Sequence, residues 1–321
     1  MIIILEGPDG SGKTTQADAI DAQFRSYRYP DTDVFRLAAG PPDPPDYSPF
    51  DEYELDFLAA VPDAEADDLI ICDRWSLGEA VYGPLLRSTS RLSPGGLLHC
   101  EMFFEARGAL RWMMMPSAPI LVKRLQQRGD DLIDTEDLTA IRQVYTYLAP
   151  RYCYSQIHDQ LDEMTVSLAL KTALARAERF EDIDAAAPGY IGAQHPVMVL
   201  AGDVRSTVLD EDPYTAAFTP ARAGSAQYLM DALATSSRHI MKHAGILNTG
   251  EPGMDLGKAH EVLGYPQWVA LGSHAAERLL EARIYGFQTA RHPSYMRRFL
   301  SKDISPQEYA HSLMRDGGLA R

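Results

Sequence analysis

The chain has 321 residues, of which 45% are hydrophobic and 23% are charged, as in ordinary globular proteins. This length allows two domains. Without an apolar run of about 18 residues, no transmembrane helix and no membrane partner are expected. The formal net charge is −15, and the acidic excess lies in 1–194 because 195–321 holds equal numbers of acidic and basic side chains. An acidic half argues against a broad electrostatic grip on nucleic acid, which needs clustered lysines and arginines.

The three cysteines, Cys72, Cys100 and Cys153, are odd in number and far apart. Their spacing predicts neither a disulfide framework nor a Cys-x-x-Cys metal site. The sequence opens on the strand-like run Met1–Leu5, which leaves no room for a signal peptide. A cytoplasmic location is therefore expected.

The stretch GPDGSGKT, residues 7–14, fits the phosphate-binding pattern G-x-x-x-x-G-K-[ST]. It follows the strand predicted over Met1–Leu5 and precedes a helix predicted over Thr14–Phe24. In such a loop, backbone N–H groups and the N-terminus of the next helix bind phosphate. Lys13 would neutralise the β- and γ-phosphate oxygens of ATP, and the Thr14 hydroxyl would bind Mg²⁺. The residues predicted to bind the nucleotide are Gly7, Asp9, Gly10, Ser11, Gly12, Lys13, Thr14 and Thr15.

Strand and helix patterns then alternate up to residue 180. The proline-rich stretch AAGPPDPPDYSPFD, residues 38–51, predicts a loop. The other predicted elements are strands at 32–37, 68–72 and 109–115, and helices at 52–60, from 117, at 134–148 and at 165–180. This alternation predicts an α/β fold, with a parallel sheet flanked by helices on both faces.

Two charged motifs accompany these elements. Asp73 and Arg74 directly follow the apolar strand 68–72, and the carboxyl ends of parallel strands line the ligand crevice. Asp73 would hold Mg²⁺ or orient the attacking oxygen, and Arg74 would bridge donor and acceptor phosphates; a strand-end ion pair is the alternative. Arg124 and Arg128 lie four residues apart, on one face of a predicted helix. Two positive side chains placed in this way can neutralise the negative charge that spreads over the phosphoryl oxygens in the transition state. A solvated basic stripe is the alternative for this pair. The predicted catalytic set is Lys13, Asp73, Arg74, Arg124 and Arg128.

Together these motifs resemble the thymidylate kinase family of nucleoside monophosphate kinases over about residues 1–180. The matched stretches are the loop 7–14, Asp-Arg-Trp at 73–75, and the two arginines before Gly-Asp-Asp at 129–131. The resemblance implies that Asp9 reaches the acceptor sugar, that Arg36 contacts the acceptor phosphate together with Arg74, and that Tyr82 lines the base pocket. The sequence departs from the family's R-E-P-G-G after the second strand, so a 5-substituted deoxyuridylate competes with thymidylate as the acceptor.

A second α/β domain is predicted over 196–321, joined to the kinase-like domain 1–182 by a linker over 183–195 that is rich in alanine, glycine and proline. Its predicted elements are strands at 197–201, 245–247 and 268–271, and helices at 225–242 and 273–282. Short blocks in this half resemble the uracil-DNA glycosylase superfamily, although Gly-Asp-Val-Arg replaces its G-E-x-P loop and its iron–sulfur cysteines are missing. The resemblance implies a three-layer domain with a base pocket formed by Asp203, Phe218, Asn248, His292 and Ser294.

Three functions stay open at this stage. The leading one is ATP- and Mg²⁺-dependent phosphorylation of a pyrimidine deoxynucleoside monophosphate, either dTMP or a 5-substituted dUMP. The alternative is a kinase for a 5-hydroxymethylpyrimidine base in DNA, with the second domain binding DNA and presenting the base, as a virus that hypermodifies its DNA in the host cytoplasm would use. The third makes the second domain a non-catalytic module for nucleotide binding or for forming a homodimer.

Overall fold

The computed structural model describes residues 1–27, 32–38, 68–128, 135–202, 224–297 and 304–319. The predicted helix 52–60 and nearly all of the proline-rich stretch 38–51 lie outside these ranges. The described residues form two compact units, each with its own sheet. The first unit contains residues of 1–38, 68–91 and 108–178, and the second contains 92–107 and 179–319.

The first unit is built on a five-stranded sheet in the order β2-β3-β1-β4-β5, with all neighbouring strands parallel. The strands are β1 (Ile2–Glu6), β2 (Val34–Ala38), β3 (Leu69–Asp73), β4 (Leu110–Met114) and β5 (Ser155–Ile157). The predicted parallel sheet is therefore confirmed. The central strand is apolar from Ile2 to Leu5 because it is covered on both faces.

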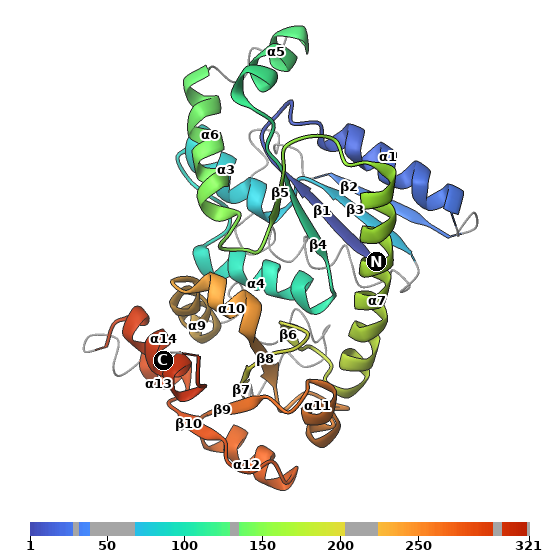
Figure 1. Ribbon diagram of the computed structural model, residues 1–321. Coiled ribbons are helices and arrows are strands. Elements are labelled where there is room, and N and C mark those ends of the chain that lie inside the picture. The colour runs from blue at the N-terminus through green and yellow to red at the C-terminus, as the bar shows by residue number, and fades with distance from the viewer. Residues whose placement is uncertain (28–31, 39–67, 129–134, 203–223, 298–303, 320–321) are drawn as a thin grey trace. The chain divides into compact units, whose positions relative to one another are not determined.

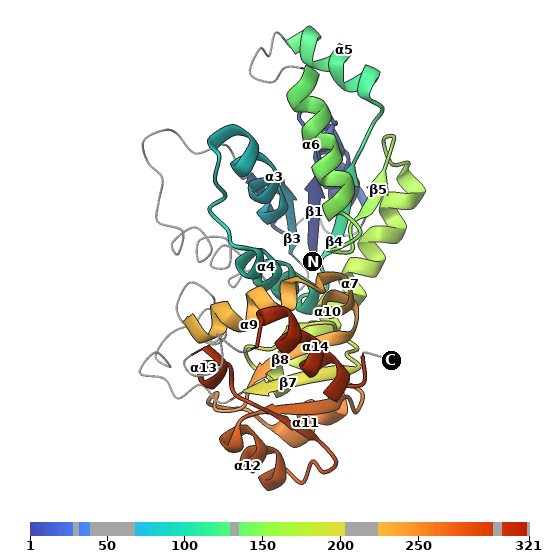
Figure 2. The same ribbon diagram turned by 90° about the vertical axis from the view of Figure 1, so that its left-hand side faces the viewer.

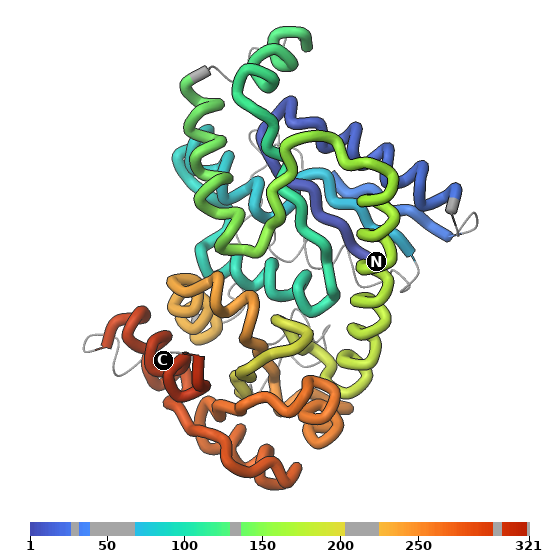
Figure 3. The backbone as a smooth tube through the Cα atoms, viewed as in Figure 1, coloured from blue at the N-terminus to red at the C-terminus, as the bar shows by residue number. Residues whose placement is uncertain are grey.

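Helices lie on both faces of this sheet, with α1 and α7 on one side and α3 and α6 on the other (Figure 1). The helices are α1 (Lys13–Tyr27), α3 (Ser76–Arg87), α5 (Ala118–Arg128), α6 (Thr135–Leu148) and α7 (Glu163–Ala186). One apolar cluster joins Ile3 and Leu5 of β1 to Ile20 of α1 and Ala173 of α7. Figure 3 follows the chain from β1 through the phosphate loop into α1. The core thus holds the loop between a buried strand and a helix whose apolar face packs on that strand.

The second unit contains a smaller sheet in the order β10-β9-β7-β8-β6. The strands are β6 (Ile191–Gly192), β7 (Met198–Gly202), β8 (Ala244–Asn248), β9 (Gln267–Leu271) and β10 (Gln288–Ala290). All neighbours are parallel except β6, which runs antiparallel to β8. The described helices of this unit are α4 (Pro94–Ala106), α9 (Gly224–Ala234), α10 (Ser237–His243), α11 (Leu256–Val262), α12 (Ser273–Glu281), α13 (Pro293–Tyr295) and α14 (Pro306–Asp316).

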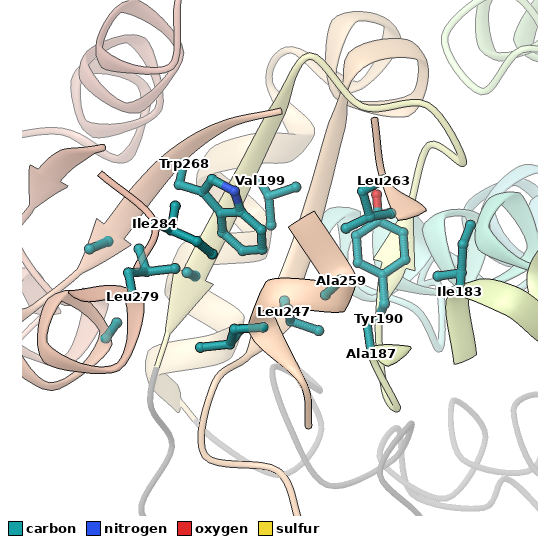
Figure 4. Packing of buried hydrophobic residues seen from close by; sticks show 14 of the residues in the cluster. Ile183, Ala187, Tyr190, Val199, Leu247, Ala259, Leu263, Trp268, Leu279 and Ile284 are labelled. Atoms are coloured by element: carbon teal, nitrogen blue, oxygen red, sulfur yellow. The ribbon is translucent and has the colours of Figure 1, made fainter. Parts of the chain in front are cut away.

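Two groups of helices sandwich this second sheet, with α9, α10 and α14 on one side and α11 and α12 on the other (Figure 2). The cluster drawn in Figure 4 shows the α11–α12 side, where Trp268, Val199 and Leu247 of the strands pack against Ala259 and Leu279 of the helices. The Trp268 indole N–H donates to Nδ1 of His260 at 2.8 Å. The arrangement is α/β, and the resemblance of this unit to uracil-DNA glycosylases stays a prediction.

Several predicted elements differ from the structure. The predicted linker 183–195 contains the last turn of α7 and strand β6, because Ile183, Ala187 and Tyr190 are buried in the second core. The predicted helix 225–242 is two helices, since the chain turns at Thr235, whose hydroxyl donates to the Ala232 carbonyl at 2.7 Å. Helix α4 was not predicted. The domain boundaries themselves stay a prediction.

Within the described residues, no helix combines the length and the apolar character that crossing a bilayer requires.

Candidate active site

The phosphate loop connects β1 to α1 in the first unit and depends on glycine at three positions. Gly7, Gly10 and Gly12 have φ values of 139°, 74° and 95°, a backbone region that L side chains rarely adopt. A Cβ on Gly7 would lie 2.3 Å from the carbonyl oxygen of Met114 in β4. The loop therefore fits against the neighbouring strand only with glycine at that position, and its backbone stays close to the carboxyl edge of the sheet.

Lys13 begins α1 and is buried under the loop. Its Nζ donates to the carbonyl oxygens of Gly7 and Pro8 at 2.9 and 3.0 Å, and lies 3.4 Å from the Ser11 hydroxyl. Burial, and then the positive charge of Arg74, lowers the pKa of Lys13 to about 8. An anion placed at the loop would favour the charged form, so the site is built to attract phosphate.

Thr14 and Asp73 meet across the sheet edge. The Thr14 hydroxyl donates to Oδ2 of Asp73 at 2.7 Å. Asp73 is the last residue of β3, and Thr14 lies in the first turn of α1. The fold therefore joins two residues that are 59 positions apart in sequence. The structure thus brings together the two residues predicted to bind Mg²⁺.

Arg74 follows Asp73 in a left-handed conformation, with φ of 65°. Its guanidinium forms an ion pair with Asp9 of the phosphate loop and lies 4.7 Å from the centre of the Tyr82 ring. The Tyr82 hydroxyl accepts a hydrogen bond from the backbone N–H of Asp9 at 3.0 Å. Three of the four predicted acceptor-binding residues, Asp9, Arg74 and Tyr82, therefore form one cluster.

The fourth predicted acceptor residue lies elsewhere. Arg36 is in the edge strand β2, and its guanidinium pairs with Asp18 at 2.5 Å and with Asp21 at 3.2 Å. Both carboxylates belong to α1. Its role at the acceptor phosphate stays a prediction.

Arg124 and Arg128 lie on α5, which follows β4. Nη1 of Arg124 donates to the Gly10 carbonyl oxygen at 3.0 Å, so the helix reaches over the loop. Both arginines line a cavity of about 300 Å³ beside the loop. Arg128 also lines a second cavity, of about 200 Å³, directly over the loop. The residues lining this second cavity are Asp9, Gly10, Gly12, Lys13, Thr14, Thr15, Ala38, Asp73, Arg74 and Arg128.

Two residues at this site escaped the sequence interpretation. Glu6, the last residue of β1, is fully buried, and its Oε1 accepts from the backbone N–H groups of Trp75 at 2.7 Å and Gly78 at 3.0 Å. The Tyr145 hydroxyl of α6 donates to Oε2 at 3.2 Å. The signal available in the sequence was a carboxylate inside an apolar strand, directly before the loop.

Of the predicted base-pocket residues in the second unit, Asn248, His292 and Ser294 are described, whereas Asp203 and Phe218 lie outside the described residues. Asn248 ends β8, pairs in register with Gly202 of β7 and is buried. His292 follows β10 and caps the short helix α13, with its Nδ1 2.7 Å from the Ser294 hydroxyl. These residues follow the carboxyl ends of strands in one sheet, where α/β proteins bind ligands.

The chain matches no protein-family model and no curated protein sequence. Among solved structures it is similar to the YorR protein of Bacillus subtilis in complex with phosphorylated GDP. That match has 20% identity and a TM-score of 0.38, and covers 56% of this chain and 96% of that one. A deoxyadenosine kinase from M. mycoides with dCMP and dCDP bound has 17% identity and a TM-score of 0.31, over 55% of this chain and all of its own.

Proposed function

We propose that the protein transfers the γ-phosphate of ATP, with Mg²⁺, to a pyrimidine deoxynucleoside monophosphate. The observation that carries this proposal is a single cavity lined by a phosphate loop, a buried lysine, a threonine–aspartate pair and two arginines. Phosphoryl transfer needs positioning and charge neutralisation more than it needs a covalent intermediate. These side chains supply both.

The donor nucleotide would occupy both cavities. Its phosphates would lie on the loop over Lys13, at the positive end of α1. Its base and sugar would lie in the larger cavity, which combines the apolar side chains of Met114, Pro116 and Ile120 with polar groups such as Gln16 and His158. A cavity of this mixed character suits a flat heterocycle with hydrogen-bonding edges.

The residues present fit Mg²⁺. Thr14 and Asp73 offer a hydroxyl and a carboxylate 2.7 Å apart, which are oxygen ligands of the kind that Mg²⁺ prefers. Mg²⁺ in nucleotide sites is held by one or two such groups plus waters and phosphates. When bound, the ion would neutralise charge on the β- and γ-phosphates.

Four positively charged side chains lie where they could stabilise the transferred phosphoryl group. Lys13 and Arg74 border the smaller cavity, and Arg128 lines both cavities. Arg124 is held over the loop by its hydrogen bond to Gly10. Together they would stabilise the charge that develops on the transferred group. Movement of α5 toward the loop would exclude water and so limit hydrolysis of ATP.

The acceptor would lie on the Arg74 side of the loop. The guanidinium of Arg74 would bind its phosphate, and the Asp9 carboxylate would accept a hydrogen bond from the sugar hydroxyl. The Tyr82 ring, which packs edge to face on the fully buried Tyr145 with ring centres 6.3 Å apart, would line the base pocket. The preference for dTMP or a 5-substituted dUMP rests on the resemblance to thymidylate kinases.

A second candidate is phosphorylation of a modified pyrimidine within DNA. The observation that favours it is the position of Asn248 and His292 at the carboxyl edge of the second sheet, where a flipped base would be held. The acidic excess of residues 1–194 works against it.

One labelling experiment tests both candidates. The protein is incubated with γ-labelled ATP and Mg²⁺, with either a panel of free deoxynucleoside monophosphates or an oligonucleotide containing 5-hydroxymethyluracil. Label on a free pyrimidine monophosphate, abolished by Lys13→Ala, supports the leading proposal. Label on the oligonucleotide alone refutes it and supports the second candidate.

A further inference from the structure

Glu6 carries a carboxylate in the interior of the first unit, where burying a charged group is energetically unfavourable. It is fully buried at the end of the central strand, and an isolated buried charge is strongly unfavourable. Its hydrogen bonds join β1 to the turn after β3, to the start of α3 and to α6.

The two backbone N–H groups bound by Glu6 belong to the segment that directly follows Arg74, the residue whose position matters most for the acceptor. Trp75 directly follows Arg74, and Gly78 packs against the Arg74 side chain so closely that a Cβ there would lie 2.5 Å from Arg74 Cγ. Arg74 also has a left-handed φ of 65°, which costs energy for a side chain other than glycine. The turn therefore needs an external anchor, and Glu6 holds its C-terminal side through the N–H groups of Trp75 and Gly78.

We propose that Glu6 is a positioning residue for phosphoryl transfer, because its carboxylate fixes the Asp73–Arg74–Trp75 turn and so places the Arg74 guanidinium at the acceptor side of the phosphate loop. This inference rests on the phosphoryl transfer proposed above. Glu6 itself does not line either cavity, so it acts through Arg74 and does not touch the reacting groups.

Ionisation of Glu6 links this anchor to pH. Burial raises its pKa to about 7, against the opposing effects of the Trp75 and Gly78 hydrogen bonds and of the positive charges on Arg74 and Lys13. The other titratable side chains that interact with it are Tyr82 of α3 and Tyr145 of α6. The anion is the stronger acceptor for the two N–H groups. Turnover should therefore fall as the pH drops below about 7.

Two substitutions separate charge from hydrogen bonding. Glu6→Gln keeps an oxygen for the Trp75 and Gly78 N–H groups, whereas Glu6→Ala removes it. A displacement of about 1 Å at a reacting group lowers turnover about a hundredfold. We expect a loss in kcat of that size for the alanine variant and a loss of about tenfold for the glutamine variant, with little change in KM for ATP. The acidic limb near pH 7 should disappear in the glutamine variant.

The matched control is Glu79→Gln. Glu79 is another buried acid of the first unit, and it pairs with Arg87 at 2.6 Å, which lines neither cavity. This variant should lose thermal stability, since breaking a buried ion pair is destabilising, and should keep its kcat. An equal fall of kcat in Glu79→Gln would show that general destabilisation, and not positioning, explains the effect.

A spectroscopic measurement tests the anchor without depending on activity. The chain has three tryptophans, so ¹⁵N-tryptophan labelling gives a sparse spectrum in which a Trp75→Phe variant assigns the Trp75 backbone amide. That amide should titrate with a midpoint near pH 7 in the wild type and not in Glu6→Gln. A wild-type Trp75 amide that does not titrate, or full kcat in Glu6→Ala, overturns the inference. Failure of the wild type to phosphorylate any acceptor refutes the proposed function instead.

Discussion

Substitution of Gly78 by alanine should impair phosphoryl transfer without unfolding the protein. The added Cβ would lie 2.5 Å from Cγ and 2.9 Å from Cδ of Arg74, whereas carbon atoms in contact normally stand about 3.5–4.0 Å apart. Arg74 must therefore move by about 1 Å. A misplacement of that size costs about a hundredfold in rate, which is about 2.7 kcal/mol of transition-state stabilisation.

The stability of this variant should change much less than its turnover. Overpacking lowers the free energy of unfolding by about 1–3 kcal/mol. Replacing glycine by alanine inside a helix raises it by up to about 1 kcal/mol and so offsets part of that loss. The assay is kcat/KM for the acceptor, measured beside thermal unfolding and ATP binding. Gly257→Ala in α11 is the matched control, because its Cβ would meet only Asp255 Oδ1, at 3.4 Å. Unchanged turnover in Gly78→Ala, or an equal loss in Gly257→Ala, would refute the assignment of Arg74 to the transfer step.

Three further outcomes are expected. The stability advantage of Glu6→Gln over the wild type should grow from pH 5 to pH 8. The reason is that the Glu6 pKa is raised from 4.5 to about 7, so ionising Glu6 in the wild type costs up to about 3 kcal/mol of folding free energy. Denaturant titrations of both proteins at both pH values measure this difference, and a difference that does not change with pH contradicts the prediction. Thr14→Val should raise the Mg²⁺ concentration for half-maximal activity at least about tenfold, whereas Thr14→Ser should not. Arg124→Ala should lower kcat by about a hundredfold or more, and Lys123→Ala, an exposed neighbour on α5, should not; equal effects would place Arg124 outside the transfer step.

The first sheet was predictable because its signals are local. Apolar runs such as Ile2–Leu5 and Leu69–Cys72 form strands buried on both faces, and the glycine pattern of residues 7–12 specifies the turn between β1 and α1. The edge position of Asp73 follows from the same pattern, since a polar residue ends an apolar run at the carboxyl edge of a parallel sheet.

The remaining features depend on partners distant in sequence. Helix α4 has no polar face, because its residues Leu97 to Phe104 are buried on all sides, so the periodicity that reveals surface helices is missing. Glu6 bonds to residues 69, 72 and 139 positions away, and no sequence spacing encodes such contacts. The α7–β6 connection escaped prediction because its alanines and glycines resemble a linker, although Ala187 is buried in the second core.

The fate of the γ-phosphate tests the central claim most directly. Protein, ATP, Mg²⁺ and dTMP are followed together by ³¹P NMR, with Lys13→Ala as the comparison. The account predicts that the ATP γ signal is lost in step with the growth of a deoxynucleoside diphosphate β signal, and that Lys13→Ala shows neither change. Growth of free phosphate alone, whether or not dTMP is present, would contradict it and make the protein a nucleotide hydrolase.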